Sequence, residues 1–138
     1  MVLVDSSAWI EAARRNGDLA CKVAIEALLD EDEAALTSPV RLEVLGGARP
    51  EDRKRLQGYL SLLPFVPVEE IDWQAAIGNG WTLRDRGLAI PWNDLLVATI
   101  ALRLRFRVYA RDRHFDDMGP VLGLDLYMPG PGGSFAPP

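Results

Sequence analysis

The sequence predicts an α/β fold whose central sheet is mostly parallel and contains four to five short strands. Short apolar runs such as residues 2–4 and 108–110 lack the alternation of a half-exposed strand, which is typical of strands buried in a parallel sheet. Longer segments with helical spacing of their apolar residues separate these runs. Because strands that alternate with helices favour parallel pairing, both observations indicate the same fold class.

The first strand is predicted over residues 2–4. Ser6 or Ser7 can then cap a helix that the pair Asn16-Gly17 ends. The second strand is predicted over residues 34–37.

A helix is predicted directly after the second strand. Ser38-Pro39 supplies a cap and a proline at the first helical position, and Gly46-Gly47 ends the helix. Another helix should begin near Pro50 and end before Pro64, and residues 65–68 are strand-like.

The second half of the chain continues the alternation. Asp72 can cap a helix with apolar and small residues at helical spacing, namely Trp73, Ala76, Ile77, Gly80 and Trp81. A central helix is predicted from Asn93 to about Leu104, the fourth strand over residues 108–110 and a fifth over residues 125–128.

The segment of residues 18–30 predicts a helix that is apolar on most of its surface. Its polar positions form a single narrow stripe, while Cys21, Ile25 and Leu29 belong to the apolar remainder. A helix of this kind is buried on more than one side, so we expect it to take part in a homodimer contact.

Length and composition favour a single domain. The chain has 138 residues, of which 49% are hydrophobic, and this is enough for one core. We expect the domain to span residues 1–128 and a tail rich in proline and glycine to span residues 129–138.

The single cysteine, Cys21, favours a reducing compartment, and no apolar run approaches the length of a membrane span. We therefore expect a cytoplasmic location without membrane contact.

The net charge of -5 argues against a nucleic-acid ligand, but its distribution does not. Residues 84–113 contain seven Arg and three Asp, so the rest of the chain carries the negative charge. This basic segment could hold phosphates, with Arg111 and Arg113 as the candidate contacts, or its arginines could simply solvate the end of a helix.

Four carboxylates lie at the edges of apolar runs: Asp5, Glu43, Asp94 and Asp112. An ionised carboxylate beside a core is costly unless a cation or a donor compensates it. Asp5 and Asp112 follow predicted strands, and Glu43 and Asp94 are expected in the first turns of helices at the same sheet edge. Because ligands in such folds bind beyond the carboxyl ends of the strands, the four acids predict one acidic pocket.

An all-oxygen pocket suits Mg²⁺, with Mn²⁺ as a substitute. Asp5 and Asp94 are the best direct ligands, Asp112 could complete a second position, and Glu43 could act through water or orient the nucleophile. Such a site can activate water for hydrolysis of a phosphodiester.

The same residues resemble a known family. The segments VLVDSSAWI (2–10), LEVLG (42–46), IPWNDLLVA (90–98) and ARDRHF (110–115) resemble, in order, the four acidic motifs of PIN-domain proteins and in particular of VapC-type toxins. The four acids are separated by 38, 51 and 18 residues, and the resemblance covers nearly the whole chain. One departure is Ala110, where the family often has Thr or Ser.

The resemblance implies a PIN-like, Rossmann-like three-layer α/β/α fold. It also implies that Asp5, Glu43, Asp94 and Asp112 are the catalytic acids of a Mg²⁺-dependent endoribonuclease. Such an enzyme is the toxin of a toxin–antitoxin pair, cleaves RNA and forms a heterooligomer with its cognate antitoxin.

Several alternatives stay open. A PIN-like module could bind RNA or a protein without cutting it. His114 is interpreted as a structural donor at a turn and is kept out of the site. Trp92 could stack on a base or simply pack. A phospho-receiver domain is excluded, because the only lysines, Lys22 and Lys54, precede every late strand.

Overall fold

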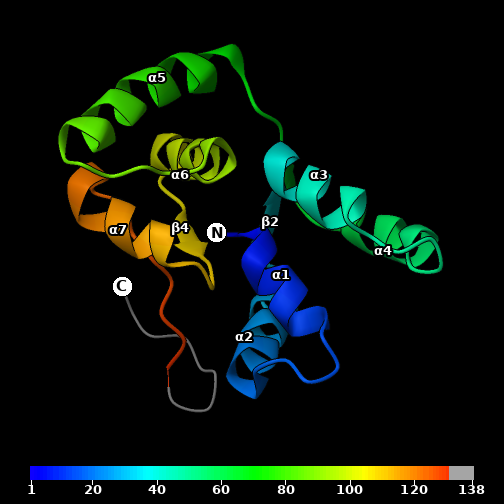
Figure 1. Cartoon of the computed structure of the whole chain (residues 1–138). Coiled ribbons are helices and arrows are strands. Elements are labelled where there is room, and N and C mark those ends of the chain that lie inside the picture. Colours follow the sequence, from blue (N-terminus) through cyan, green and yellow to red (C-terminus); the bar gives the residue numbers. More distant parts are fainter. Residues whose placement is uncertain (131–138) are drawn as a thin grey trace.

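Four short parallel strands form the centre of the computed structural model, which describes residues 1–130 (Figure 1). The strands are β1 (Val2–Val4), β2 (Ala34–Thr37), β3 (Phe65–Val66) and β4 (Arg107–Tyr109). Their order in the sheet is β3-β2-β1-β4, so β1 is central and pairs with both β2 and β4. The predicted α/β class with a parallel sheet is confirmed.

The prediction of a fifth strand over residues 125–128 is wrong for the described part of the chain. Leu126 forms a single parallel bridge with Val108. Two backbone hydrogen bonds surround it, from Val108 N–H to the Asp125 carbonyl (3.0 Å) and from Tyr127 N–H to the Val108 carbonyl (2.8 Å). This segment therefore lies beside β4 without continuing the ladder.

Helices cover both faces of the sheet. They are α1 (Ser6–Ala13), α2 (Leu19–Asp30), α3 (Ser38–Gly46), α4 (Arg53–Leu60), α5 (Glu70–Asp85), α6 (Trp92–Leu104) and α7 (Arg113–Leu122). Figure 1 shows α5, α6 and α7 grouped on one side of the strands, α1 and α2 on the other, and α3 and α4 reaching outward beyond β2. This arrangement agrees with the three-layer α/β/α expectation.

The core lies between β1 and the helices on either side. Val2, Leu3 and Val4 have no solvent exposure, and every residue of α6 from Asp94 to Ala101 is buried. Burying each large aliphatic side chain contributes about 1.5–3 kcal/mol before the entropy cost. The central position predicted for α6 is thus confirmed, and it fixes the acid at its start against the sheet.

Helix α2 buries most of its apolar side chains within its own chain, although Leu19 at its start is 71% exposed. Cys21, Ala24, Ile25 and Leu28 all contact the core, and Ile25 is only 5% exposed. The apolar surface that motivated a dimer contact on this helix is therefore mostly used inside the monomer. The homodimer stays a prediction, but Ile25→Arg would place a charge in the core and cannot serve as its test.

Helix α5 begins three residues earlier than predicted, so Asp72 is not its cap. Glu69 occupies the cap position, and the Asp72 carboxylate accepts a hydrogen bond from the Glu69 N–H (2.9 Å). Asp72 also accepts two hydrogen bonds from the Arg103 guanidinium, at 2.6 and 2.9 Å. Arg103 thus connects α6 to α5 and is not available to hold phosphate.

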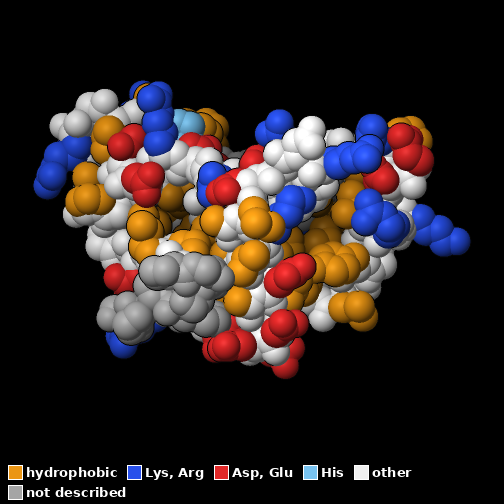
Figure 2. Space-filling model, turned by 90° about the horizontal axis from the view of Figure 1, so that it is seen from below, with side chains coloured by type: hydrophobic (Ala, Val, Ile, Leu, Met, Phe, Trp, Pro, Cys, Tyr) orange, Lys and Arg blue, Asp and Glu red, His pale blue; other side chains and the backbone are white. Residues whose placement is uncertain are grey.

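A groove of about 890 Å³ lies between α1, α2, α3 and α4. Its walls include Trp9, Ile25, Leu29, Tyr59 and Leu60, and the rings of Trp9 and Tyr59 meet edge to face with their centroids 6.4 Å apart. Lys and Arg side chains outnumber acids along it: Arg14, Arg15, Lys22, Arg49 and Arg55 against Glu26 and Asp52. Figure 2 shows hydrophobic side chains gathered in this hollow with basic ones at its rim.

The tail expected over residues 129–138 falls, from residue 131 onward, outside the described residues. Within the described part, every helix is too short or too polar to cross a membrane.

Candidate active site

Asp5 lies directly after β1 and caps α1, at the carboxyl end of the central strand. One of its oxygens, Oδ2, accepts hydrogen bonds from the Ser7 N–H (3.1 Å) and the Ser7 hydroxyl (2.6 Å). The other oxygen, Oδ1, is buried and has no hydrogen-bond partner within the described residues. Capping of α1 thus explains the role of Oδ2 only. Oδ1, which is buried and accepts no hydrogen bond from the described residues, has the properties of a cation ligand.

Burial raises the pKa of Asp5 above its ordinary value, and the nearby charge of Asp112 adds to the increase. The two hydrogen bonds from Ser7 act in the opposite direction but do not outweigh burial. The residue is only 1% exposed. Ionised Asp5 is therefore an electrostatic cost that a bound cation would offset.

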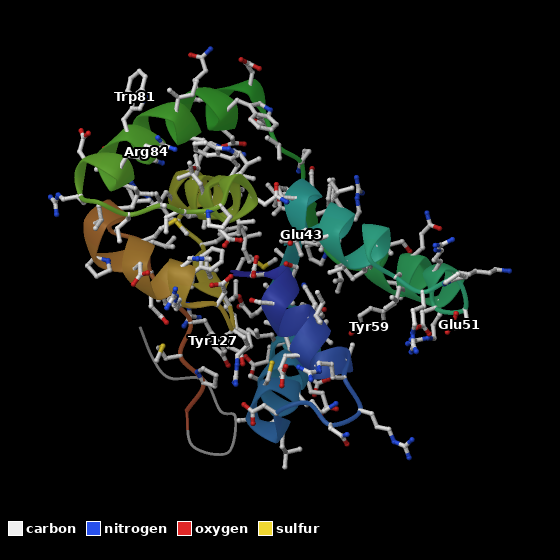
Figure 3. All side chains as sticks on the ribbon, viewed as in Figure 1. Glu43, Glu51, Tyr59, Trp81, Arg84 and Tyr127 are labelled. Atoms are coloured by element: carbon white, nitrogen blue, oxygen red, sulfur yellow. The ribbon has the colours of Figure 1, made fainter. Side chains whose placement is uncertain are left out.

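Glu43 lies in the second turn of α3, not in the first turn as expected. The helix starts at Ser38, immediately after β2, so Glu43 is its sixth residue. Figure 3 shows Glu43 on the side of α3 that faces α6 and the start of α1. Its Oε1 is buried and, like Oδ1 of Asp5, accepts no hydrogen bond from the described residues. The longer glutamate side chain compensates for the deeper position in the helix.

Asp94 occupies the first turn of α6, as predicted, and is 7% exposed. Burial raises its pKa to about 6, and the charges of Asp5 and Asp112 contribute in the same direction. His114 lowers the pKa by hydrogen bonding and by its charge. The electrostatic influence of Asp5 and Asp112 on Asp94 indicates that the three acids share one pocket.

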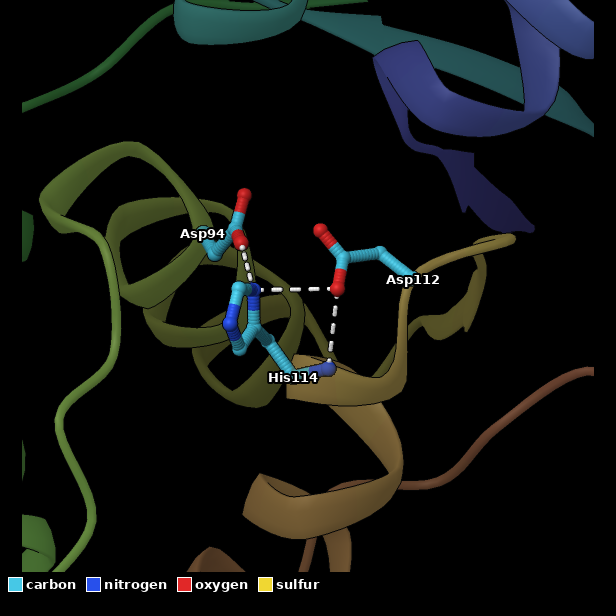
Figure 4. Close-up of side chains that lie close together, drawn as sticks. All are labelled: Asp94, Asp112 and His114. Atoms are coloured by element: carbon cyan, nitrogen blue, oxygen red, sulfur yellow. Dashed lines mark hydrogen bonds and ion pairs between the residues drawn. The ribbon is translucent and has the colours of Figure 1, made fainter.

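His114 connects two of the acids (Figure 4). Its Nδ1 lies 3.0 Å from Asp94 Oδ2 and 2.9 Å from Asp112 Oδ1. When both carboxylates are ionised they can only accept hydrogen bonds, and Nδ1–H is then the donor that they share. Asp112 also caps α7 by accepting the His114 N–H at 3.0 Å.

Ligand atoms of Asp94, Asp112 and His114 all lie within 4.8 Å of one another. Neither Asp5 nor Glu43 belongs to this group of described residues, but the charge of Asp5 acts on Asp94, and the Asp5 N–H donates to the Tyr109 carbonyl at the end of β4 (2.9 Å). The structure thus brings Asp5, Asp94 and Asp112 together and places Glu43 at the edge.

Sequence reasoning missed His114. The residue was expected at a turn, but it is the second residue of α7, a helix that was not assigned in advance. The available signal was Asp112 itself, because an Asp that caps a helix holds the N–H of the residue two positions later.

The two candidate substrate contacts flank Asp112. Arg111 forms an ion pair with Asp18 (2.6 Å), and its backbone N–H donates to the Ser7 hydroxyl (2.9 Å). Arg113 is the first residue of α7 and is exposed. Arg111 therefore ties the α2 start to the site, which limits its reach, while Arg113 faces solvent beside the acids.

Comparison with known proteins agrees with this architecture. Residues 2–120 match the family model of the PIN domain. The chain is 34% identical over 129 residues to a protein of Mycobacterium tuberculosis named ribonuclease VapC11, covering 90% of this chain and 96% of that protein.

Two solved structures are similar in fold. VapBC2 from Rickettsia felis, bound to a DNA fragment from its promoter, superposes with a TM-score of 0.75 at 20% identity, covering 91% of this chain and 97% of that one. A toxin–antitoxin complex from Klebsiella pneumoniae gives a TM-score of 0.72 at 18% identity, covering 90% and 95% of the two chains.

Proposed function

The chain belongs to the PIN-domain family and, within it, to the VapC ribonucleases, and we propose that it is a Mg²⁺-dependent endoribonuclease that acts as the toxin of a toxin–antitoxin pair. The observation that carries the metal-dependent mechanism is the acidic pocket. Asp94 from α6 and Asp112 from the β4–α7 connection lie there with His114, the neighbour of both, and buried Asp5, directly after β1, adds its charge to theirs.

The donor set fits a hard divalent cation. All four acids offer carboxylate oxygen, and one buried oxygen each of Asp5 and Glu43 receives no hydrogen bond from residues 1–130. Asp5, Asp94 and Asp112 would hold the ion, and Mn²⁺ could replace Mg²⁺. When bound, the cation lowers the pKa of a water molecule and neutralises charge on the phosphate.

The protein's own residues position the reaction. Ser7 fixes Asp5 through two hydrogen bonds, and His114 holds Asp94 and Asp112 at a common atom. Glu43, at the edge of the site, is the acid suited to accept a proton from the attacking water or to orient it. Arg113, exposed beside Asp112, is the better placed of the two candidate arginines to meet a phosphate.

The direct test is cleavage of total cellular RNA with Mg²⁺, followed by mapping of new 5′ ends. We expect discrete new ends that EDTA eliminates. A protein that binds RNA but produces no ends with Mg²⁺ or Mn²⁺ would instead favour the non-catalytic binding module.

We propose that the antitoxin binds in the groove between α1, α2, α3 and α4. The groove is apolar along its length and basic at its rim, which suits an amphipathic segment with acidic residues. The groove runs alongside α1, and Asp5 caps the start of this helix. A segment bound in the groove could therefore extend to the acids. An Arg at that end would clamp the carboxylates and compete with metal and RNA.

The groove proposal can be tested with Leu29→Arg, which places a charge on its wall. We expect this variant to lose affinity for a partner encoded beside the gene and to keep its RNA cleavage. Leu62→Arg is the matched control, because Leu62 is 82% exposed and does not line the groove. Equal affinity of wild type, Leu29→Arg and Leu62→Arg would exclude the groove.

The homodimer and the cytoplasmic location are retained as proposals. The single cysteine, Cys21, is buried and forms no disulfide within the chain, which suits a reducing compartment. Light scattering of the purified chain at micromolar concentration tests the dimer, and a monomer mass there would remove it.

A further inference from the structure

A second, smaller cavity lies beside the acidic pocket. Its volume is about 310 Å³, at the low end of the range for small-molecule sites (roughly 300–1,000 Å³). It lies between the end of α5, the start of α6 and α7, and its lining includes Gly80, Arg84, Trp92, Leu95 and His114. Because His114 also contacts Asp94 and Asp112, this cavity and the acidic pocket share a wall.

The chemistry of the lining suits a flat aromatic ligand. Trp92 is 68% exposed, although indole rings usually bury most of their surface. The Arg84 guanidinium lies 6.0 Å from the centre of the Trp92 ring, and Figure 3 shows Arg84 between α5 and α6. An exposed indole with a guanidinium over its ring combines an aromatic surface on which unpaired bases stack with a cationic hydrogen-bond donor.

Gly80 lines this cavity where α5 packs closely on α6. A Cβ atom at Gly80 would lie 3.2 Å from Leu95 Cδ2 and 3.7 Å from Trp92 Cζ3. Glycine inside a helix costs about 1 kcal/mol relative to alanine, so its presence at this contact needs a reason. The close packing of α5 on α6 beneath Trp92 explains why glycine occupies this position.

We propose that this cavity receives an unpaired nucleobase of the RNA, next to the phosphate held at the acids. The base stacks on Trp92, and Arg84 donates hydrogen bonds to its edge. This inference rests on the proposed function, because it requires RNA as the substrate. On this proposal, the contacts of Trp92 and Arg84 with the base determine the position at which an RNA loop is cleaved.

Binding measured without catalysis tests the cavity. The probe is a single-stranded RNA oligonucleotide that spans a mapped cleavage site, titrated into Asp94→Asn and followed by fluorescence anisotropy. Adding Trp92→Ala should weaken binding about tenfold, the typical loss for one stacked base, and Trp92→Phe should restore most of it. Trp81→Ala is the matched control, because Trp81 is also 68% exposed, points away from the body of the molecule and does not line the cavity.

Abasic substitution identifies the base that is bound. Removing one base next to the cleavage site should weaken binding about tenfold when Trp92 is present and have no further effect in Trp92→Ala. Additive losses from the two changes would overturn the proposal.

The proposed function and this inference fail in different ways. Absence of cleavage by the wild type with Mg²⁺ or Mn²⁺ would refute the function. Normal cleavage by the wild type, together with unchanged RNA binding and unchanged cleavage positions in Trp92→Ala, would refute the cavity alone.

A pair of glycine variants adds a check on the packing argument. Gly80→Ala should push on Leu95 in the cavity wall, whose Cδ2 lies 3.2 Å from the new Cβ, and weaken RNA binding, whereas Gly78→Ala should not, since a Cβ at Gly78 meets nothing within 4 Å. Equal binding by the two variants would show that the shape of this wall does not matter for RNA binding.

Discussion

Asp72 and Asp94 are the same residue type at the same place in neighbouring helices, yet they serve opposite purposes. Each is the third residue of its helix, α5 or α6, and they are 1% and 7% exposed. Asp72 receives two hydrogen bonds from Arg103, whereas Asp94 faces Asp5, Asp112 and the imidazole of His114.

The two pKa values record this difference. Burial alone would raise the pKa of Asp72, but the hydrogen bonds from Arg103 and from the Glu69 N–H hold it below the ordinary value. Burial and two like charges raise the pKa of Asp94 to about 6. Asp72 is paired with an arginine and has a structural role. Asp94 is buried among other acids, and this is typical of a residue that binds a cation.

The largest expected effect separates the two aspartates by activity. Asp94→Asn keeps the side-chain volume and removes a proposed metal ligand, so RNA cleavage should fall by about a hundredfold or more. Asp72→Asn should retain cleavage at temperatures where it is folded. The measurement is the initial rate of RNA cleavage with saturating Mg²⁺. Wild-type rates in Asp94→Asn would show that Asp94 is not part of the site.

The second largest effect is on thermal stability, where Asp72→Asn should be more damaging than Asp94→Asn. Asp72→Asn breaks the ion pair with Arg103 and should cost about 2 kcal/mol, or about 5–8 °C in Tm. This is less than for a fully buried pair, because the Arg103 side chain is 26% exposed and also lies 3.8 Å from Glu69. Asp94→Asn should leave the Tm of the metal-free protein unchanged or raised. Thermal melts in EDTA compare them, and a lower Tm in Asp94→Asn than in Asp72→Asn would reverse the assignment.

The smallest effect is a difference in pH dependence. An unfolded Asp titrates near pH 4, whereas folded Asp94 has a pKa of about 6. Between pH 4 and pH 6 the folded protein therefore binds more protons at this residue than the unfolded chain does, and its stability falls as the pH rises. Metal-free wild type should therefore lose a few degrees of Tm relative to Asp94→Asn as the pH rises from 4 to 7.

Asp72 should show the opposite sign, because its pKa is lowered on folding. Its contribution is present above pH 4 and disappears on acidification. The gap between wild type and Asp72→Asn should hold from pH 5 to 8 and narrow below 4. A gap that widens on acidification would contradict the pairing.

The sequence was sufficient for the parts of the site that follow from local rules. Asp5 and Asp112 lie after strands and Asp94 lies in the first turn of α6, and the carboxyl-edge rule for parallel sheets places such residues together. Most strands and helices up to β4 could be predicted for the same reason, because each has its own periodicity and capping residues, whereas α7 was not predicted.

The parts that could not be predicted depend on contacts between distant segments. The pairing of Asp72 with Arg103 spans 31 residues, and nothing local distinguishes it from a helix cap. His114 enters the site only because α7 returns its first turn to α6. The burial of α2 inside its own chain also follows from packing, which is why an apolar helix alone did not locate a dimer surface.

The central claim is that Asp5, Asp94 and Asp112 form a divalent-metal site, and calorimetric titration of Mn²⁺ into the purified protein tests it most directly. Wild type and Asp72→Asn, measured below the melting temperature of each, should bind Mn²⁺ saturably. Near pH 6 they should release protons as they bind, because Asp94 is partly protonated there. Asp94→Asn should bind at least tenfold more weakly and release fewer protons. Equal affinity and equal proton release in wild type and Asp94→Asn would contradict the account.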